Sequence, residues 1–388
     1  MPPSPPFETD SLQNDWRLLL ECASSAPDPE KLSVLLSPVD WPRLLALAED
    51  HGVMGHLTAS LRKLGDGAVP ASIKQTLMDR QREQMFYTLK LSAELFRILD
   101  QFATEKIAAL VVKGPVLAMQ AYGDPAMRSY GDLDLLVRQR DIRRATELML
   151  SAGYQAAISI AAIDSGKIPG QYLFSRPEAK LLVELHNDFT LRYFPRRLPL
   201  EKFFERQIRV RLDAHDAPAL CVEDELVLIC IHGAKHFWER LIWIADVAAL
   251  VIRQTHIDWR RVAESAKEVG AERLLHTGLR LAKNLLRMPL PPETMAMVEA
   301  DRQSARLAEQ ILRWLPAAGY APGLFERAVF RLRMRGGFLA APAYLLRLSL
   351  SPTEEDWQAG PGENRHGFLE ALRRPLRLAR KYGRTGKS

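Results

Sequence analysis

The segment GDLDLLV carries two aspartates, Asp132 and Asp134, separated by one apolar residue. Side chains two positions apart in a β-strand point to the same face, so both carboxylates are expected together at the start of a strand. Oxygen ligands in this arrangement suit Mg²⁺ or Mn²⁺. The pair predicts a divalent metal site, although Asp-x-Asp pairs also occur as structural residues in turns and helix caps.

Glu184 is the best candidate for a third carboxylate at this site. It lies within the apolar segment KLLVELHNDF, where an ionised side chain is costly unless a metal or a cation accompanies it. Three carboxylates can hold two ions about 3.5–4 Å apart, one activating an attacking oxygen and the other stabilising a leaving group. The three acids together therefore predict a two-metal centre beside a phosphate-bearing substrate.

A phosphate-binding turn is expected at Gly114, where a short apolar run gives way to a helical pattern. Backbone N–H groups at the start of a helix attract phosphate oxygens, and Lys113 and Arg128 can add positive charge. Pro115 follows the glycine and offers neither a hydroxyl nor an N–H group. Lys113 is expected to compensate through its charge.

The segment IHGAKHFWERLIWIADV places His232, Lys235 and His236 at helical spacing, so that several polar side chains share one face. The two histidines have the spacing of a zinc-binding helix, but no glutamate follows the first one, and the metalloprotease motif is absent. Interdomain packing and contacts to a nucleotide are the alternatives to zinc. Asp246, farther along, can pair with Lys235 or Arg240, or brace the helices.

Several of these segments together resemble the uncharacterised bacterial nucleotidyltransferases of the DNA polymerase β-like superfamily. The similar segments are KG, LAMQAYGDPAMR, SYGDLDLLV, GY and ELH, with HGAKHFWERLIWIADVAALV and RRPLRLARK farther along, so most of the chain is covered. The resemblance implies Asp132 and Asp134 as the metal pair, Glu184 as the third carboxylate and Gly114 as the phosphate-loop glycine. The superfamily commonly has Gly-Ser in this loop, and Pro115 departs from that pattern.

The elements that must position these residues form an α/β core. Short apolar or alternating runs at IAALVV, LDLLV, KLLVELHNDF and QIRVRLDA predict strands, and VLAMQAYG and RQRDIRRATELMLSAGY predict helices between them. We therefore expect an α/β (α+β) fold with a minimal nucleotidyltransferase sheet. Helical patterns on both sides add an N-terminal helical region and a C-terminal all-α domain, with the active cleft between the core and this domain.

The expected boundaries follow the change of pattern. Residues 1–14 are expected to be disordered, 15–104 helical, 105–222 the catalytic core, 223–350 the C-terminal helical domain, and 351–388 a linker with a basic tail. The tail can touch nucleic acid or anionic lipid, but a solvated amphipathic helix is the preferred interpretation.

Composition limits the class of protein. The 388 residues are 47% hydrophobic and 26% charged, which is typical of a globular protein and argues against disorder. The net charge of +6 suits acidic partners such as nucleotides. Three widely spaced cysteines indicate a reducing cytoplasm, and no run of apolar residues predicts a transmembrane segment.

The expected activity is metal-dependent transfer of a nucleoside monophosphate, AMP from ATP, to an unknown acceptor, with release of pyrophosphate. The cofactor is Mg²⁺ or Mn²⁺, and the nucleoside triphosphate is the co-substrate. A small molecule, sugar, peptide or protein is favoured over nucleic acid as the acceptor. The alternatives are phosphoryl transfer on the same scaffold, or a catalytically weak nucleotide-binding scaffold or partner protein in a tailoring or toxin–antitoxin pathway.

Overall fold

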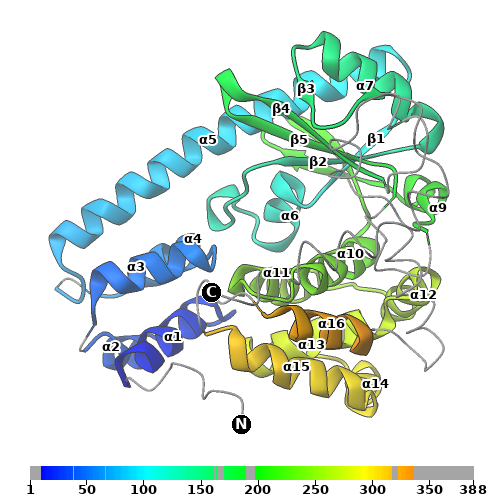
Figure 1. The fold of residues 1–388 in the computed structure, drawn as a ribbon. Helices are drawn as coiled ribbons and strands as arrows, with labels where there is room; N and C mark the ends of the chain where they lie inside the picture. Colours follow the sequence, from blue (N-terminus) through cyan, green and yellow to red (C-terminus); the bar gives the residue numbers. More distant parts are fainter. Residues whose placement is uncertain are drawn as a thin grey trace, which may run out of the picture.

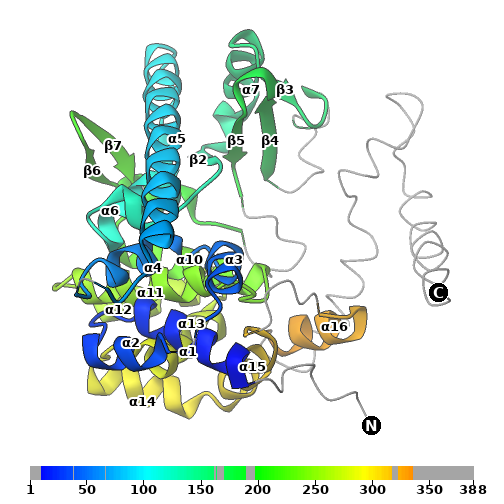
Figure 2. The same cartoon turned by 90° about the vertical axis from the view of Figure 1, so that its left-hand side faces the viewer.

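The protein is described by a computed structural model, which places residues 10–37, 39–65, 67–160, 163, 170–188, 197–316 and 322–334. A mixed β-sheet lies above a broad layer of helices, and the long helix α5 (Ala71–Thr104) extends from the helical layer to the sheet (Figures 1 and 2). The mixed α/β fold expected from the sequence is confirmed. The basic tail at 351–388 lies outside the described residues.

The sheet has seven strands in the order β3-β4-β5-β2-β1-β7-β6. Its centre is mixed, because β2 runs parallel to β5 and antiparallel to β1, while β1 runs parallel to β7. Its strands are β1 (Ala109–Val112), β2 (Leu133–Val137), β3 (Gln155–Ala156), β4 (Gln171–Arg176), β5 (Leu181–His186), β6 (Ile208–Leu212) and β7 (His215–Ala219). The four strands expected from the sequence are β1, β2, β5 and β6.

Short helices connect these strands. They are α6 (Gly114–Ala121), α7 (Ile142–Ser151) and α9 (Leu200–Glu205), with the 3-10 turns η1 (Pro125–Met127), η2 (Gln139–Asp141) and η3 (Pro177–Ala179). Helix α6 lies between the sheet and the helical layer in both views, and it packs on α11 (Leu241–Arg253) (Figures 1 and 2). The segment after β1 therefore joins the sheet to the helices.

Helices from both ends of the chain build the helical layer. The N-terminal ones are α1 (Asp10–Ala23), α2 (Pro29–Leu35), α3 (Trp41–Asp50) and α4 (Met54–Leu61), and the C-terminal ones are α10 (Val222–Lys235), α11, α12 (Trp259–Val269), α13 (Glu272–Leu286), α14 (Pro292–Ala300), α15 (Arg302–Trp314) and α16 (Leu324–Arg333). Helix α1 begins at Asp10, five residues earlier than expected. None of the described helices is long and apolar enough to cross a membrane.

One hydrophobic core joins the two sets of helices. It contains Leu18 and Leu57 from the N-terminal helices and Ile244 and Leu279 from the C-terminal helices, all of them fully buried. An ion pair between Arg287 and Glu21 also ties the two sets together. The helical regions that flank the catalytic core in sequence therefore pack together in space.

The alternation of side chains along β2 divides the sheet between two cores. Leu133 and Leu135 belong to a second core, which α5 covers with Leu91 and Leu95, whereas Leu136 belongs to the core of the helical layer. Asp134 has the same parity as Leu136, so it points to the face of the sheet that meets the C-terminal helices. The fold thus places this carboxylate between the sheet and α10.

Candidate metal and nucleotide site

The strand register brings Asp134 and Glu184 together. Strands β2 and β5 are parallel neighbours, and Asp134 is the Cα partner of Glu184. Side chains at paired positions of adjacent strands lie on the same face, so the two carboxylates are neighbours. Asp132 immediately precedes β2 and has the same parity as Asp134. The structure thus gathers the three carboxylates that the sequence singled out at the start of β2 and the middle of β5.

His186 lies between two of these carboxylates. Its Nε2 atom is 2.7 Å from Oδ1 of Asp134 and 3.4 Å from Oε2 of Glu184. Burial would lower the pKa of this imidazole, but hydrogen bonds to the two carboxylates raise it above its usual value. Sequence reasoning assigned His186 no role, although it stands two residues after Glu184 on the same face of the strand.

Lys113 contacts this group of carboxylates through Asp134. Its Nζ atom lies 2.8 Å from Oδ2 of Asp134, and its side chain is almost fully buried. Its backbone has a φ of +54° and Gly114 follows at +43°, so two consecutive residues adopt the left-handed region where β1 turns into α6. The buried Glu225 of α10 accepts the Lys113 backbone N–H at 3.0 Å. This contact supports a conformation that is unfavourable for lysine.

The electrostatics of the group favour a bound cation. Burial and the neighbouring Asp134 raise the pKa of Asp132 to about 6. Burial would also raise the pKa of Asp134, but Lys113 and His186 outweigh it and lower that pKa. Because three carboxylates share the space with one ammonium group and one imidazole, an additional cation would relieve their repulsion.

Helix α10 contributes the polar residues expected opposite the carboxylates. Nδ1 of His232 is 3.5 Å from Nζ of Lys113. Lys235 donates a hydrogen bond of 2.8 Å to Gln171, which in turn donates to Glu184. Two of the three predicted α10 residues are therefore connected to the acidic group.

The third, His236, packs against His232 of α10 and Trp243 of α11. Its ring centroid is 4.7 Å from that of His232 and 5.3 Å from that of Trp243. Burial followed by the charge of Lys235 lowers the pKa of His236 to about 4, so its imidazole is neutral at physiological pH. Within the described residues, no group of three metal ligands includes either histidine of α10.

Arg128 occupies a different environment. Its guanidinium makes a buried ion pair with Asp246 of α11, with Nε 3.0 Å from Oδ2, and the hydroxyl of Tyr122 donates to the same carboxylate. The partner of Asp246 is thus Arg128, whereas Arg240 donates to the backbone carbonyl of Asp50. Arg128 connects the segment before β2 to the helical layer, and a phosphate contact would require this pair to open.

The donor set fits a hard divalent cation. Asp134, Glu184 and His186 each offer a ligand atom, and these atoms lie within 4.8 Å of one another. Carboxylate oxygens suit Mg²⁺ and Mn²⁺, and an imidazole nitrogen is a better ligand for Mn²⁺ than for Mg²⁺. The residues present could therefore hold a metal ion.

Two comparisons with known proteins bear on this site, and one of them identifies a family. No curated protein matches the chain. A family model described as an uncharacterised nucleotidyltransferase matches residues 37–287, which include every strand of the sheet and all the candidate site residues. The match spans more than half of the 388 residues and confirms the resemblance seen in the sequence. The chain therefore belongs to this uncharacterised nucleotidyltransferase family.

Proposed function

We propose that this protein transfers a nucleoside monophosphate, AMP from ATP, to an acceptor and releases pyrophosphate, with Mg²⁺ or Mn²⁺ as the cofactor. The observation that carries the proposal is the pairing of Asp134 with Glu184 in neighbouring strands, beside Asp132, whose pKa is raised to about 6. Carboxylates that destabilise one another at neutral pH are a sign of a site built for a cation.

In this proposal Asp132 and Asp134 bind the metal ions, and Glu184 positions the second ion. His186 already contacts both Asp134 and Glu184, so it holds these two carboxylates in place. Two bound divalent ions would lower the pKa of the acceptor hydroxyl and neutralise charge on the departing pyrophosphate.

The positive groups around the carboxylates would bind the triphosphate. Lys113 pairs with Asp134 in the absence of a ligand, and its ammonium group can turn to a phosphate oxygen once a metal ion neutralises that acid. The first turn of α6 adds the backbone N–H groups of Gly114 and Val116. His232 and Lys235 supply contacts from α10, and His236 lies beside them.

In the chemical step, the acceptor oxygen attacks the α-phosphorus, a new P–O bond forms, and the bond between the α-phosphorus and its bridging oxygen breaks. The electron pair of that bond leaves with pyrophosphate, and the acceptor proton passes to Glu184. Glu184 suits this role because its carboxylate is only partly buried and adjoins the proposed metal ligands.

One observation favours a catalytically weak scaffold as the second candidate. Pro115 stands where a hydroxyl residue would help to bind the triphosphate, and its ring lines a pocket bounded by α5 instead. Phosphoryl transfer on the same metal site would give a product of different mass from nucleotidyl transfer.

Calorimetric titration with each of the four nucleoside triphosphates, with and without Mg²⁺ or Mn²⁺, tests the proposal. We expect metal-dependent binding of one triphosphate, ATP, that is lost in Asp132→Ala/Asp134→Ala. Asp216→Asn, an exposed change in the β6–β7 hairpin, is the matched control and should bind as the unmodified protein does. If no triphosphate binds, a partner protein without nucleotide binding replaces the transferase.

A further inference from the structure

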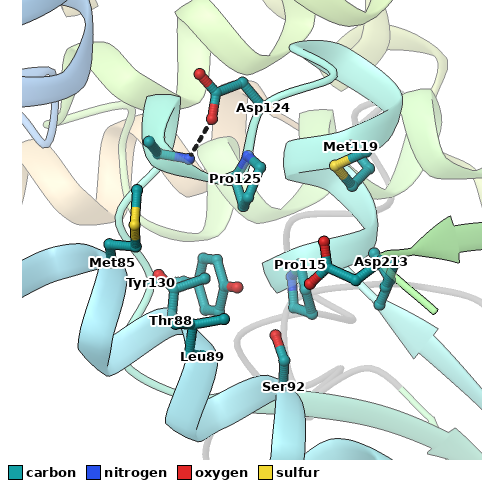
Figure 3. A pocket seen from close by; sticks show the side chains of 12 residues that line it. Met85, Thr88, Leu89, Ser92, Pro115, Met119, Asp124, Pro125, Tyr130 and Asp213 are labelled. Carbon is teal, nitrogen blue, oxygen red and sulfur yellow. Dashed lines mark hydrogen bonds between the residues drawn. The ribbon is translucent and has the colours of Figure 1, made fainter. Parts of the chain in front are cut away.

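A pocket lies between α5, α6, η1 and the β6–β7 turn (Figure 3). Its cavity volume is about 70 Å³, several times the roughly 10–15 Å³ that one water molecule needs, so it has room for a small group and opens to solvent. Its apolar wall includes Met85 and Leu89 of α5, which are about half exposed, and Met119 of α6. We call it the α5–α6 pocket.

This pocket is separate from the carboxylate group. Tyr130, one of its lining residues, packs in the core that α5 covers, on the face of the sheet opposite to Asp134. The two sites adjoin at the turn between β1 and α6, where Pro115 lines the pocket and Lys113 contacts Asp134, and Tyr130 of the pocket precedes Asp132 by two residues. A ligand in the pocket would therefore lie behind the proposed phosphate-binding turn.

The charge of the lining excludes phosphate compounds. Asp124 and Asp213 line the pocket, and no lysine, arginine or histidine does. The Asp124 carboxylate accepts the Ala126 backbone N–H, as Figure 3 shows, and no ion pair found among the described residues includes Asp124 or Asp213. In a chain with a net charge of +6, this local excess of acid favours a cationic ligand.

The pocket also contains a buried polar group, the hydroxyl of Tyr130. Tyr130 is only 8% exposed, and its hydroxyl lies near the hydroxyls of Thr88 and Ser92 without a hydrogen bond of good geometry to a described residue. Figure 3 shows this hydroxyl directed into the pocket, toward Pro115 and Asp213. A buried hydroxyl without a well-formed hydrogen bond is unfavourable, and a ligand with a polar group could supply that bond.

We propose that the α5–α6 pocket binds a small amine with an apolar body. The apolar part would pack on Met85, Leu89 and Met119, and the amino group would lie between the carboxylate of Asp213 and the hydroxyl of Tyr130. This site is independent of the nucleotidyltransferase proposal, because it uses none of the metal or phosphate ligands.

The test uses 2-phenylethylamine as the probe, with 3-phenylpropionate and 2-phenylethanol as anionic and neutral analogues of similar size. Binding is measured by ligand-observed NMR on the full chain. We expect the amine to bind with a Kd of about 1 mM or below, as a ligand of this size allows, and at least about tenfold more tightly than the carboxylate. Equal binding of the two charged probes, or no amine binding at about ten times that concentration, would overturn the proposal.

Two variants locate the site. Asp213→Asn should weaken amine binding severalfold and leave 2-phenylethanol unaffected, since asparagine tolerates the left-handed backbone at this position (φ +52°). Asp216→Asn in the same hairpin is the control and should leave amine binding unchanged. Calorimetric titration of both variants with Mg²⁺ and ATP tests separately whether the proposed nucleotide site is intact. If Asp213→Asn binds the amine as tightly as the unmodified protein, the assignment is wrong.

Discussion

Asp132→Asn should stabilise the metal-free protein. The pKa of Asp132 is raised from 3.8 to about 6, first by burial and then by Asp134. The folded protein therefore holds this proton more tightly than the unfolded chain, and ionisation of the group opposes folding. Asparagine stays neutral at all pH values and removes the penalty.

The magnitude follows from the shift. One pKa unit corresponds to about 1.4 kcal/mol, so a shift from 3.8 to about 6 corresponds to about 3 kcal/mol, an upper limit because the side chain is only partly buried. Below pH 3.8 the group is protonated in both states and the penalty is absent. It grows as the pH rises and is complete above about pH 6.

The assay is urea-induced unfolding in EDTA between pH 4 and pH 8. We expect Asp132→Asn to be more stable than the unmodified protein by up to about 3 kcal/mol at pH 8, with little difference at pH 4. Added Mg²⁺ should narrow the difference, because a cation stabilises the ionised carboxylate. Asp216→Asn serves as the exposed control. A variant that is no more stable at pH 8, or a difference that does not change with pH, would refute the reasoning.

Three further predictions concern the contacts around the site. Asp246→Ala should lower the free energy of unfolding by about 3–5 kcal/mol, because it leaves the Arg128 guanidinium buried without its partner. Urea-induced unfolding measures this change, and a loss below about 1 kcal/mol would contradict the prediction. Glu225→Ala should lower the free energy of unfolding by about 1–3 kcal/mol in the same assay, because the Lys113 N–H loses its acceptor. Glu225→Gln keeps an acceptor and should lower it less, and equal losses of stability in the two variants would argue against this contact. His186→Asn should weaken the binding of Mn²⁺ and Mg²⁺ about tenfold or more, because Asp134 and Glu184 lose the imidazole that holds them. Calorimetry measures this, and unchanged binding of both ions would contradict that role.

The parts of the site that the sequence predicted are those that depend on local pattern. The one-residue spacing of Asp132 and Asp134 is a local property of a strand, and β2 has it. Glu184 stood out because a carboxylate in an apolar run needs a partner, and the register supplies Asp134 as its neighbour. The turn at Gly114 followed from the change from strand to helix, and the structure adds that its φ is positive.

The remaining features depend on pairing between distant segments. Strand β4 (Gln171–Arg176) is not predicted by the sequence, because its mixed polar and apolar residues carry little signal before they pair with β5. The burial of Arg128 against Asp246 joins residues 118 positions apart, and no local pattern distinguishes such an arginine from a phosphate ligand. Amphipathic helices likewise do not reveal which apolar faces will meet.

The contact between Arg287 and Glu21 has a consequence for synthesis of the chain. These residues are 266 positions apart, so at about 5–20 residues per second α13 emerges from the ribosome roughly 10–50 s after α1. Until the C-terminal helices emerge, beginning with α10, the apolar faces of the first four helices lack these partners. The helical layer must therefore be completed after the sheet segments have already been made, and the nascent chain must protect its first 60 residues from aggregation during that interval.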